Sequence, residues 1–311
     1  MTATAITAIS WNVEHGRAID QAAAWVRQQE ADIYFAQEVQ PGQCDLLADL
    51  LDMDGYTAAH RPGSTHSTAI FLKRGGPLAH GETHSQQWWA PWHAPANVTV
   101  RVRDTDGTLS PRQISCVSGH ACYWSSTNRL IEAEWCATLA KPAWLAMHFW
   151  DWNSPRAGED RPWGGYEDRA YVAARTYYEG GERRTDDRPD RQMLAAGYVE
   201  MARHAAQHLD QPEAMRPSSG YRKHAGRPDV PPYTIDRGYM SAELAPTLVS
   251  YTVCDTPELR RLSDHLPLRA VFSTAKLRSI LHRSAGRQEH TWQRPSGQST
   301  AANGTSQAAE A

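Results

Sequence analysis

Short apolar runs of strand length alternate with helical patterns along the first part of the chain. Each run is bounded by polar residues, glycine or proline, which is typical of strands buried in a sheet. After the first run, Ile19, Ala22, Ala23 and Val26 recur at the spacing of a helix face. We therefore predict strands over residues 5–11, 32–36 and 67–72, and helices over residues 17–30 and 46–51.

From residue 97 the pattern changes. Valines at every second position predict a strand over residues 97–103, and the Asp-Thr-Asp-Gly turn after it predicts an antiparallel return over residues 113–118. Strands that alternate with helices and then pair as hairpins indicate mixed sheets with helices outside. We predict further strands over residues 143–148, 233–236, 248–253 and 266–272, and helices over residues 125–140 and 190–209.

Two segments lack a periodic apolar pattern. Residues 154–190 are polar and predict a long surface excursion, and such loops are often functional. From about residue 284 the chain has scarcely a large apolar residue, so burial cannot offset the entropy of ordering it. We expect one domain over residues 1–275, with the excursion inside it, and a mostly disordered C-terminal tail over residues 276–311.

Composition narrows the function classes. The 311 residues carry a net charge of −3, so no overall basic field indicates nucleic acid, although 28 of the 32 basic residues are Arg. The five cysteines form no CxxC pair, which favours a reducing compartment without disulfide-linked partners. We find no signal-peptide pattern and no run of membrane-span length. The expected location is the cytoplasm.

Polar side chains follow several of the predicted strands at the point where each strand ends. Hard oxygen donors among them suit Mg²⁺ or Mn²⁺. A carboxylate can position a water, an amide N–H can hold an oxyanion, and a His–Asp pair can orient an imidazole toward a phosphate oxygen. Together they contain the parts for metal-assisted phosphoester hydrolysis. The set consists of Asn12, Glu38, His120, Asp151, Asn153, Asp236, Asp264 and His265.

Five motifs in order make the chain resemble the endonuclease/exonuclease/phosphatase family, the superfamily of DNase I, exonuclease III-type repair nucleases, neutral sphingomyelinases and inositol polyphosphate 5-phosphatases. The likeness covers roughly residues 5–273. Each motif alone is weak, and their order and spacing make the likeness specific. They are Ser10-Trp11-Asn12-Val13, Ala36-Gln37-Glu38-Val39, Trp150-Asp151-Trp152-Asn153-Ser154, Ile235-Asp236 and Ser263-Asp264-His265-Leu266-Pro267.

The resemblance implies an α/β fold: a four-layered sandwich of two mixed β-sheets face to face, flanked by helices, with the site at one edge. It also implies a role for each residue of the set. Glu38, Asp264 and Asn12 would hold the metal. Asp151 would align or activate water, Asn153 would stabilise the transition state, and His265, oriented by Asp236, and His120 would contact the phosphate. Arg129 and Trp152 are expected to bind substrate.

The sequence departs from the family at two places and leaves the substrate open. Trp150 stands where the family usually has Gly, and Ala121 stands where it has Leu. The leading hypothesis is a Mg²⁺- or Mn²⁺-dependent phosphodiesterase, a nuclease whose partner is nucleic acid. The alternatives are a phosphatase or phosphodiesterase for a lipid or inositol headgroup, and a non-catalytic module that binds phosphates or a partner protein on the same fold.

Overall fold

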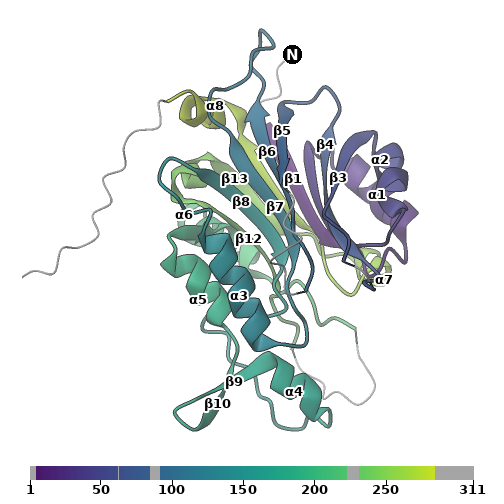
Figure 1. Ribbon diagram of the computed structural model, residues 1–311, viewed down its shortest axis with the longest axis vertical. Coiled ribbons are helices and arrows are strands. Elements are labelled where there is room, and N and C mark those ends of the chain that lie inside the picture. The colour runs from purple at the N-terminus through teal and green to yellow at the C-terminus, as the bar shows by residue number, and fades with distance from the viewer. Residues whose placement is uncertain (1–4, 62, 85–91, 223–230, 284–311) are drawn as a thin grey trace, which may run out of the picture.

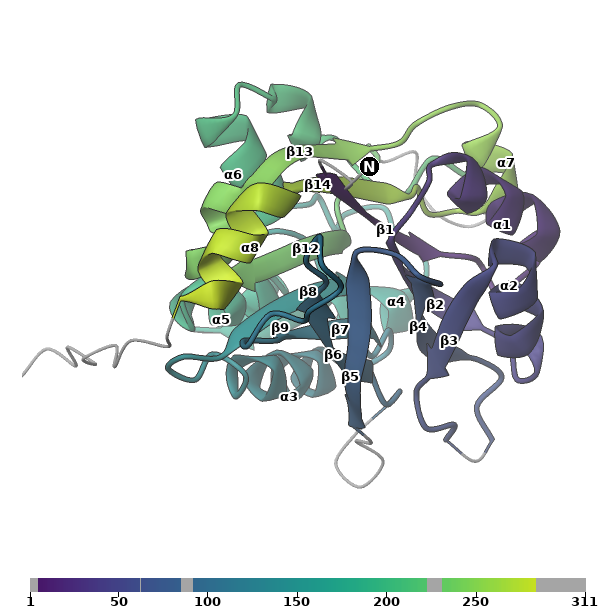
Figure 2. The same cartoon turned by 90° about the horizontal axis from the view of Figure 1, so that it is seen from above.

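The chain folds into two six-stranded sheets packed face to face, with helices on the outer face of each (Figure 1). The structure, a computed structural model, describes residues 5–61, 63–84, 92–222 and 231–283. The view from above in Figure 2 separates the layers. The predicted four-layered α/β sandwich is therefore confirmed.

The first sheet has the strand order β13-β14-β1-β2-β4-β3. Strands β1 and β2 at its centre are parallel and joined by α1, and the other pairs are antiparallel. These two strands are buried along nearly their whole length because the second sheet covers one face and helices the other. Its elements are β1 (Ala5–Asn12), α1 (Ile19–Gln28), β2 (Ile33–Val39), α2 (Gln43–Leu51), β3 (Met53–Thr57), β4 (Ser67–Lys73), β13 (Leu248–Val253) and β14 (Leu268–Ser273).

The second sheet, ordered β11-β12-β8-β7-β6-β5, repeats this plan. Strands β7 and β8 are its parallel pair, joined by α3, and a second apolar cluster with Trp150 and Met193 fills the space beneath α3 and α5. Its elements are β5 (Leu78–His84), β6 (Ala96–Val102), β7 (Ile114–His120), α3 (Ser126–Ala137), β8 (Leu145–Asp151), α5 (Arg188–Ala195), β11 (Tyr198–Glu200) and β12 (Asp236–Ser241).

The remaining elements lie around the sandwich. A small lobe of one helix and a two-stranded hairpin projects at the bottom of Figure 1. Among the described residues no helix combines the length and the apolar character needed to cross a membrane. These elements are α4 (Arg169–Arg175), β9 (Thr176–Glu179), β10 (Glu182–Thr185), α6 (Met201–His208), η1 (Pro212–Met215), η2 (Ala242–Thr247), α7 (Leu259–Leu262) and α8 (Thr274–His282).

Several elements differ from the sequence prediction. The structure adds the edge strands β3 and β5, whose mostly exposed residues lack the apolar signature of a buried strand. The helix predicted over residues 190–209 is wrong as one element. Gly197 adopts a φ of +87°, which ends α5, and the chain then forms β11 before α6 begins.

Both non-periodic segments contain structure. The excursion over residues 154–190 includes α4, β9, β10 and the start of α5. The boundary predicted at residue 275 falls inside α8, whose Leu277, Ile280 and Leu281 are buried against the domain. Residues 284–311, the rest of the predicted tail, lie outside the described residues.

Candidate active site

The two parallel strand pairs end at the same edge of the sandwich. Asn12 and Glu38 come from the carboxyl ends of β1 and β2, and His120 and Asp151 from those of β7 and β8. A cavity of about 730 Å³ opens at this edge. Of the eight strand-end residues, six line it, namely Glu38, His120, Asp151, Asn153, Asp264 and His265. The other two, Asn12 and Asp236, are buried, with 1% and 4% of their surface exposed. Asn12 bonds to Glu38 and Asp236 bonds to His265.

Glu38 and Asp151 face each other across one shared donor. The Asn12 amide nitrogen donates to Glu38 Oε1 and to Asp151 Oδ2, each at 3.0 Å, and the His15 backbone N–H donates to Glu38 Oε2 at 2.9 Å. Burial favours the neutral acid, but the nearby His120 imidazole and the Asn12 hydrogen bond outweigh it and lower the pKa of Glu38 to about 2. Glu38 is thus held as a carboxylate at neutral pH.

The backbone is strained at the same place. Glu38 has a φ of +59° at an irregularity in the β2–β4 pairing, which turns its side chain toward the strand ends. Asn153 has a φ of +48°, and its N–H donates to Asp151 Oδ1 at 2.9 Å. The Asp151–Asn153 stretch is therefore an Asx-type turn as well as part of the pocket wall. Such strain in residues other than glycine clusters at functional sites.

His265 is fixed from three sides. Its Nδ1 lies 2.8 Å from Asp236 Oδ2, the Ser218 hydroxyl donates to the same carboxylate at 2.8 Å, and the Trp11 indole donates to the His265 carbonyl at 2.9 Å. Burial disfavours charge on the ring, but the carboxylates of Asp236, Asp151 and Asp264 raise the pKa of His265 well above its usual 6.5. His265 is therefore a cation that presents Nε2 to the pocket. Nothing in the sequence pattern pointed to Ser218.

Trp150 leaves the pocket open. Its indole is 1% exposed and stacks on Trp152 with ring centroids 4.9 Å apart. A Cβ on the facing Gly119 would lie 2.1 Å from the Trp150 ring, so glycine there makes room for the indole. The departure from the family pattern changes the core beneath the site and leaves the Asp151–Asn153 turn intact.

The two residues expected to bind substrate do not lie in the pocket, and that prediction is corrected. Arg129 and Trp152 are each 0% exposed. Arg129 forms an ion pair with Asp186 at 2.8 Å and donates to the carbonyls of Cys122 and Ala174. A side chain enclosed by protein partners cannot reach a ligand. Arg129 instead ties α3 to the 154–190 segment.

Part of the pocket rim comes from that segment. Arg161, Tyr166, Tyr171 and Arg175 all line the cavity. Arg175 donates to the carbonyl and to the side-chain oxygen of Asn153, each at 2.9 Å, so it links the lobe directly to the Asp151–Asn153 turn. The Arg161 guanidinium lies 3.8 Å from the ring centre of Tyr233. These residues carry no motif, and only the fold brings them to the site.

The donor set at the pocket floor fits a divalent cation. One ligand atom each from Glu38, His120 and Asp151 lies within 4.8 Å of the others, and Asp264 is on the same wall, with Oδ1 4.0 Å from His265 Nε2. No lysine or arginine among the described residues pairs with Glu38 or Asp151. The predicted ligand Asn12 instead presents its amide nitrogen to both carboxylates.

Comparison with known proteins identifies the fold. No protein-family model matches the sequence, and no curated protein matches it significantly. An AP endonuclease from Archaeoglobus fulgidus superposes with a TM-score of 0.58 at 14% identity, over 86% of this chain and 99% of that one. TDP2 from D. rerio, complexed with a single-strand DNA product, gives 0.56 at 14% identity over 87% and 99%. A mannosyl-6-phosphatase from Bacteroides thetaiotaomicron gives 0.53 at 14% identity over 85% and 98%.

These likenesses show that the chain has the fold of the DNase I-like superfamily, as the motif order indicated. At identities this low the shared fold does not specify the reaction or the substrate. The chemistry has to be argued from the pocket.

Proposed function

We propose that this protein is a divalent-metal-dependent phosphoester hydrolase, and a nuclease by substrate. One observation supports the proposal above the others. Two carboxylates, Glu38 and Asp151, converge on a cavity whose facing wall presents the protonated imidazole of His265. A phosphate ester needs a cation at its oxygens and a base for the attacking water, and the pocket places both kinds of group together.

The roles follow from the contacts. Asp151 Oδ2 lies 3.8 Å from His265 Nε2, so a phosphate at the open side of this pair would meet a base and a cation next to each other. Asn153 uses its amide nitrogen on the Ala121 carbonyl, which leaves one of its two N–H hydrogens for a phosphoryl oxygen. Asp236 and Ser218 keep the His265 ring in place. Glu38, with Asp264, would hold the metal, which would supply charge neutralisation at the phosphate.

The rim supports a nucleic-acid substrate with unpaired bases. Tyr166, Tyr171 and Trp92 line the cavity mouth beside Arg161 and Arg175. Aromatic rings stack on bases of any sequence, and each such contact contributes about 1–3 kcal/mol. The TDP2 neighbour, solved with a single-strand DNA product, is in line with this assignment.

The size of the pocket favours one alternative. About 730 Å³ is the size of a site for a small molecule. A phosphomonoester of a sugar, nucleotide or inositol would fit it, and a neighbour on the same fold is a mannosyl-6-phosphatase. The phosphodiester headgroup of a sphingolipid is a further small substrate to be compared.

The test is hydrolysis across a substrate panel with Mg²⁺, Mn²⁺ or EDTA. The panel holds single-stranded, duplex and abasic DNA, RNA, a sugar phosphate, an inositol polyphosphate, sphingomyelin and bis-p-nitrophenyl phosphate. The variants Asp151→Ala and His265→Ala run beside the native protein. We expect metal-dependent cleavage of single-stranded DNA that both variants lose. Turnover that survives both substitutions would overturn the assignment of the centre.

A separate measurement addresses the non-catalytic alternative. An intact metal site raises Tm in the presence of Mg²⁺ or Mn²⁺, and Glu38→Ala should abolish the shift. Tight phosphate binding with no turnover on any substrate would favour a binding module. Preferential cleavage of the sugar phosphate would establish the phosphatase instead of the nuclease.

A further inference from the structure

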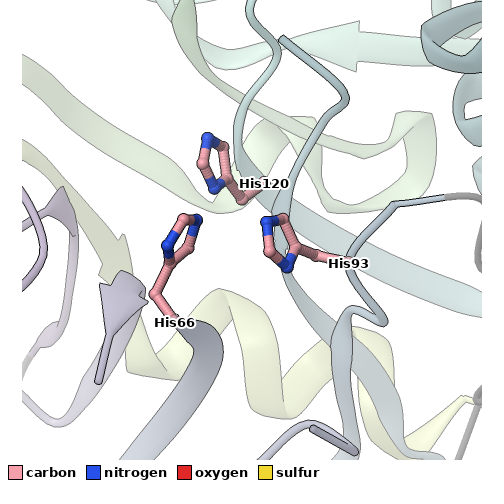
Figure 3. Close-up of side chains that lie close together, drawn as sticks. All are labelled: His66, His93 and His120. Atoms are coloured by element: carbon pink, nitrogen blue, oxygen red, sulfur yellow. The ribbon is translucent and has the colours of Figure 1, made fainter. Parts of the chain in front are cut away.

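A cluster of three histidines adjoins the pocket wall. His66 directly precedes β4, His93 lies shortly before β6, and His120 ends β7. They are 8%, 5% and 4% exposed. One ring nitrogen from each lies within 4.8 Å of the other two, and in Figure 3 each ring turns a nitrogen toward the space between them. The fold thus gathers three imidazoles that no sequence motif marks.

One nitrogen of each ring already has a neighbour. The Thr65 hydroxyl lies 3.1 Å from His66 Nδ1, and the Ser64 hydroxyl lies 3.4 Å from His93 Nδ1. On the third ring, His120 Nε2 lies 3.5 Å from Asp151 Oδ2. This carboxylate faces Nε2, so Nδ1 is the nitrogen of His120 that a metal in the shared space would take.

The three remaining nitrogens have nothing to bind. His66 Nε2, His93 Nε2 and His120 Nδ1 are buried, and within the described part of the chain they have no hydrogen-bond partner. Unpaired buried polar atoms are rare because each carries a desolvation cost. Three of them facing one space require a shared partner.

The hydrogen-bond roles decide what that partner is. The Ser64 hydroxyl donates to the His66 carbonyl at 2.7 Å, so toward His93 Nδ1 it acts as the acceptor, which leaves the lone pair of His93 on Nε2. Lone pairs that converge on one space repel an anion. A single water has two hydrogens to donate and cannot satisfy three lone pairs. A cation that accepts three imidazoles satisfies all of them at once.

We propose that His66, His93 and His120 form a second metal site, separate from the carboxylate site, for a borderline first-row transition-metal ion such as Zn²⁺. Three protein ligands with one open position are typical of catalytic zinc. His66 and His120 also line the cavity, so the site would adjoin it. Nitrogens on one tetrahedral ion lie about 3.4 Å apart, so the rings draw together by roughly 1 Å on binding.

The site is selective by ligand type. Imidazole suits zinc, cobalt and nickel, whereas Mg²⁺ prefers oxygen. The carboxylates of Glu38 and Asp264 and the histidine trio could therefore hold different metals in the same pocket wall. A second cation here would add positive charge beside the phosphate position without using an acid of the first site.

The test is a metal titration of the chelator-stripped full chain, without substrate and in excess Mg²⁺. Co²⁺ serves as the probe because its d–d absorption bands report coordination. We expect one equivalent bound with tetrahedral bands. Loss of an outer-shell partner of a metal ligand costs about 10–100-fold in affinity, so H66N and H93N should each weaken binding by at least about 100-fold.

Two control variants separate this site from its rivals. His204 and His208 lie one turn apart on α6 with ring centroids 4.8 Å apart, and such a pair can chelate a metal alone. H204N removes that pair, and E38Q weakens the carboxylate site. Both should retain Co²⁺ binding. The proposal is overturned if H66N and H93N still bind Co²⁺ with native affinity. It is also overturned if E38Q, and not H66N or H93N, abolishes Co²⁺ binding.

One readout needs no variant. X-ray absorption of the Zn²⁺-loaded native chain should show three imidazole ligands and one oxygen. A shell made mainly of carboxylate oxygen, or failure of the native chain to bind Zn²⁺ or Co²⁺ at all, overturns the site. Because substrate is absent throughout, neither result depends on whether phosphoester hydrolysis is the right function.

Discussion

Two sets of buried charged side chains in this fold have opposite roles. In the pocket set (Glu38, Asp151, Asp236 and His265), all but Asp236 line a cavity, and the first two carboxylates share a single amide donor. The anchor set (Arg129, Asp186, Arg156 and Glu200) is neutralised inside the protein, with Arg129–Asp186 at 2.8 Å and Arg156–Glu200 at 2.6 Å. Both sets are almost completely buried, so burial does not distinguish them.

What distinguishes them is unfilled capacity. A carboxylate with a guanidinium partner has no need of a ligand, whereas two carboxylates that share one donor at a cavity do. The anchor set instead secures the 154–190 segment to the domain. Arg129 on α3 donates to Ala174 inside the segment, and Arg156 inside the segment donates to Glu200 outside it. Buried carboxylates without a cationic protein partner therefore indicate a functional site.

The largest expected effect comes from Asp151→Asn. The change keeps the size of the side chain and removes the base, so kcat should fall by about 10³-fold or more on whichever substrate is cleaved. Steady-state kinetics with a thermal melt measure it. The matched control is Asp186→Asn, an equally buried acid, which should lower Tm and leave kcat of the folded protein within about 3-fold. Equal losses of kcat in both variants would erase the distinction between the sets.

Arg129→Ala should have the next largest effect, on stability. Removing one partner of a buried ion pair leaves Asp186 uncompensated and costs about 3–5 kcal/mol in the free energy of unfolding. Urea denaturation measures this. The control Arg184→Ala breaks an exposed pair with Glu179 and should cost about 1 kcal/mol or less. A rise in KM without destabilisation would restore Arg129 as a substrate-binding residue.

Glu132 offers a pH test next to the anchor set. Burial, only partly offset by the Cys122 N–H and Arg129, raises the pKa of Glu132 from 4.5 to about 8. The folded protein then keeps a proton that the unfolded chain releases above 4.5, so this stabilisation is complete below pH 4.5 and is lost as pH rises to 8.

The corresponding variant is Glu132→Gln, which cannot titrate. Its free energy of unfolding should vary less with pH than that of the native chain, by up to about 3 kcal/mol between pH 4.5 and 7. Urea denaturation at several pH values measures the difference. An unchanged pH profile in the variant would show that Glu132 is ionised in the fold.

The smallest effect on activity is expected from Arg175, which links the 154–190 segment to the turn beside Asp151. Arg175 holds both oxygens of Asn153 and belongs to the anchored segment. Arg175→Lys keeps the charge and loses the fork that contacts two oxygens, so kcat/KM should fall by about 10-fold, or ~1.4 kcal/mol, with little change in Tm. Kinetics on single-stranded DNA measure it. No change would mean that the lobe does not position the catalytic turn.

The sequence by itself determined the parts of the molecule that local pattern controls. Apolar runs located β1, β2, β4, β7 and β8 because strands covered on both faces are apolar throughout. Asp151 was singled out because a polar residue at the end of such a run interrupts the pattern. The strand predicted over residues 233–236 is wrong, since Asp236 begins β12. The edge strands β3 and β5 were missed because exposed strands carry no such pattern.

Only the tertiary structure decided which charges meet. Arg129 and Arg175 are the same residue type, yet the fold encloses the first and turns the second to the pocket. His66 and His93 belong to no motif. They lie near His120 because the chain segments before β4 and before β6 converge with the end of β7. Contacts between segments far apart in sequence depend on packing and register, and a linear pattern contains neither. The physical reason is that a site requires particular distances between side chains, and folding alone sets those distances.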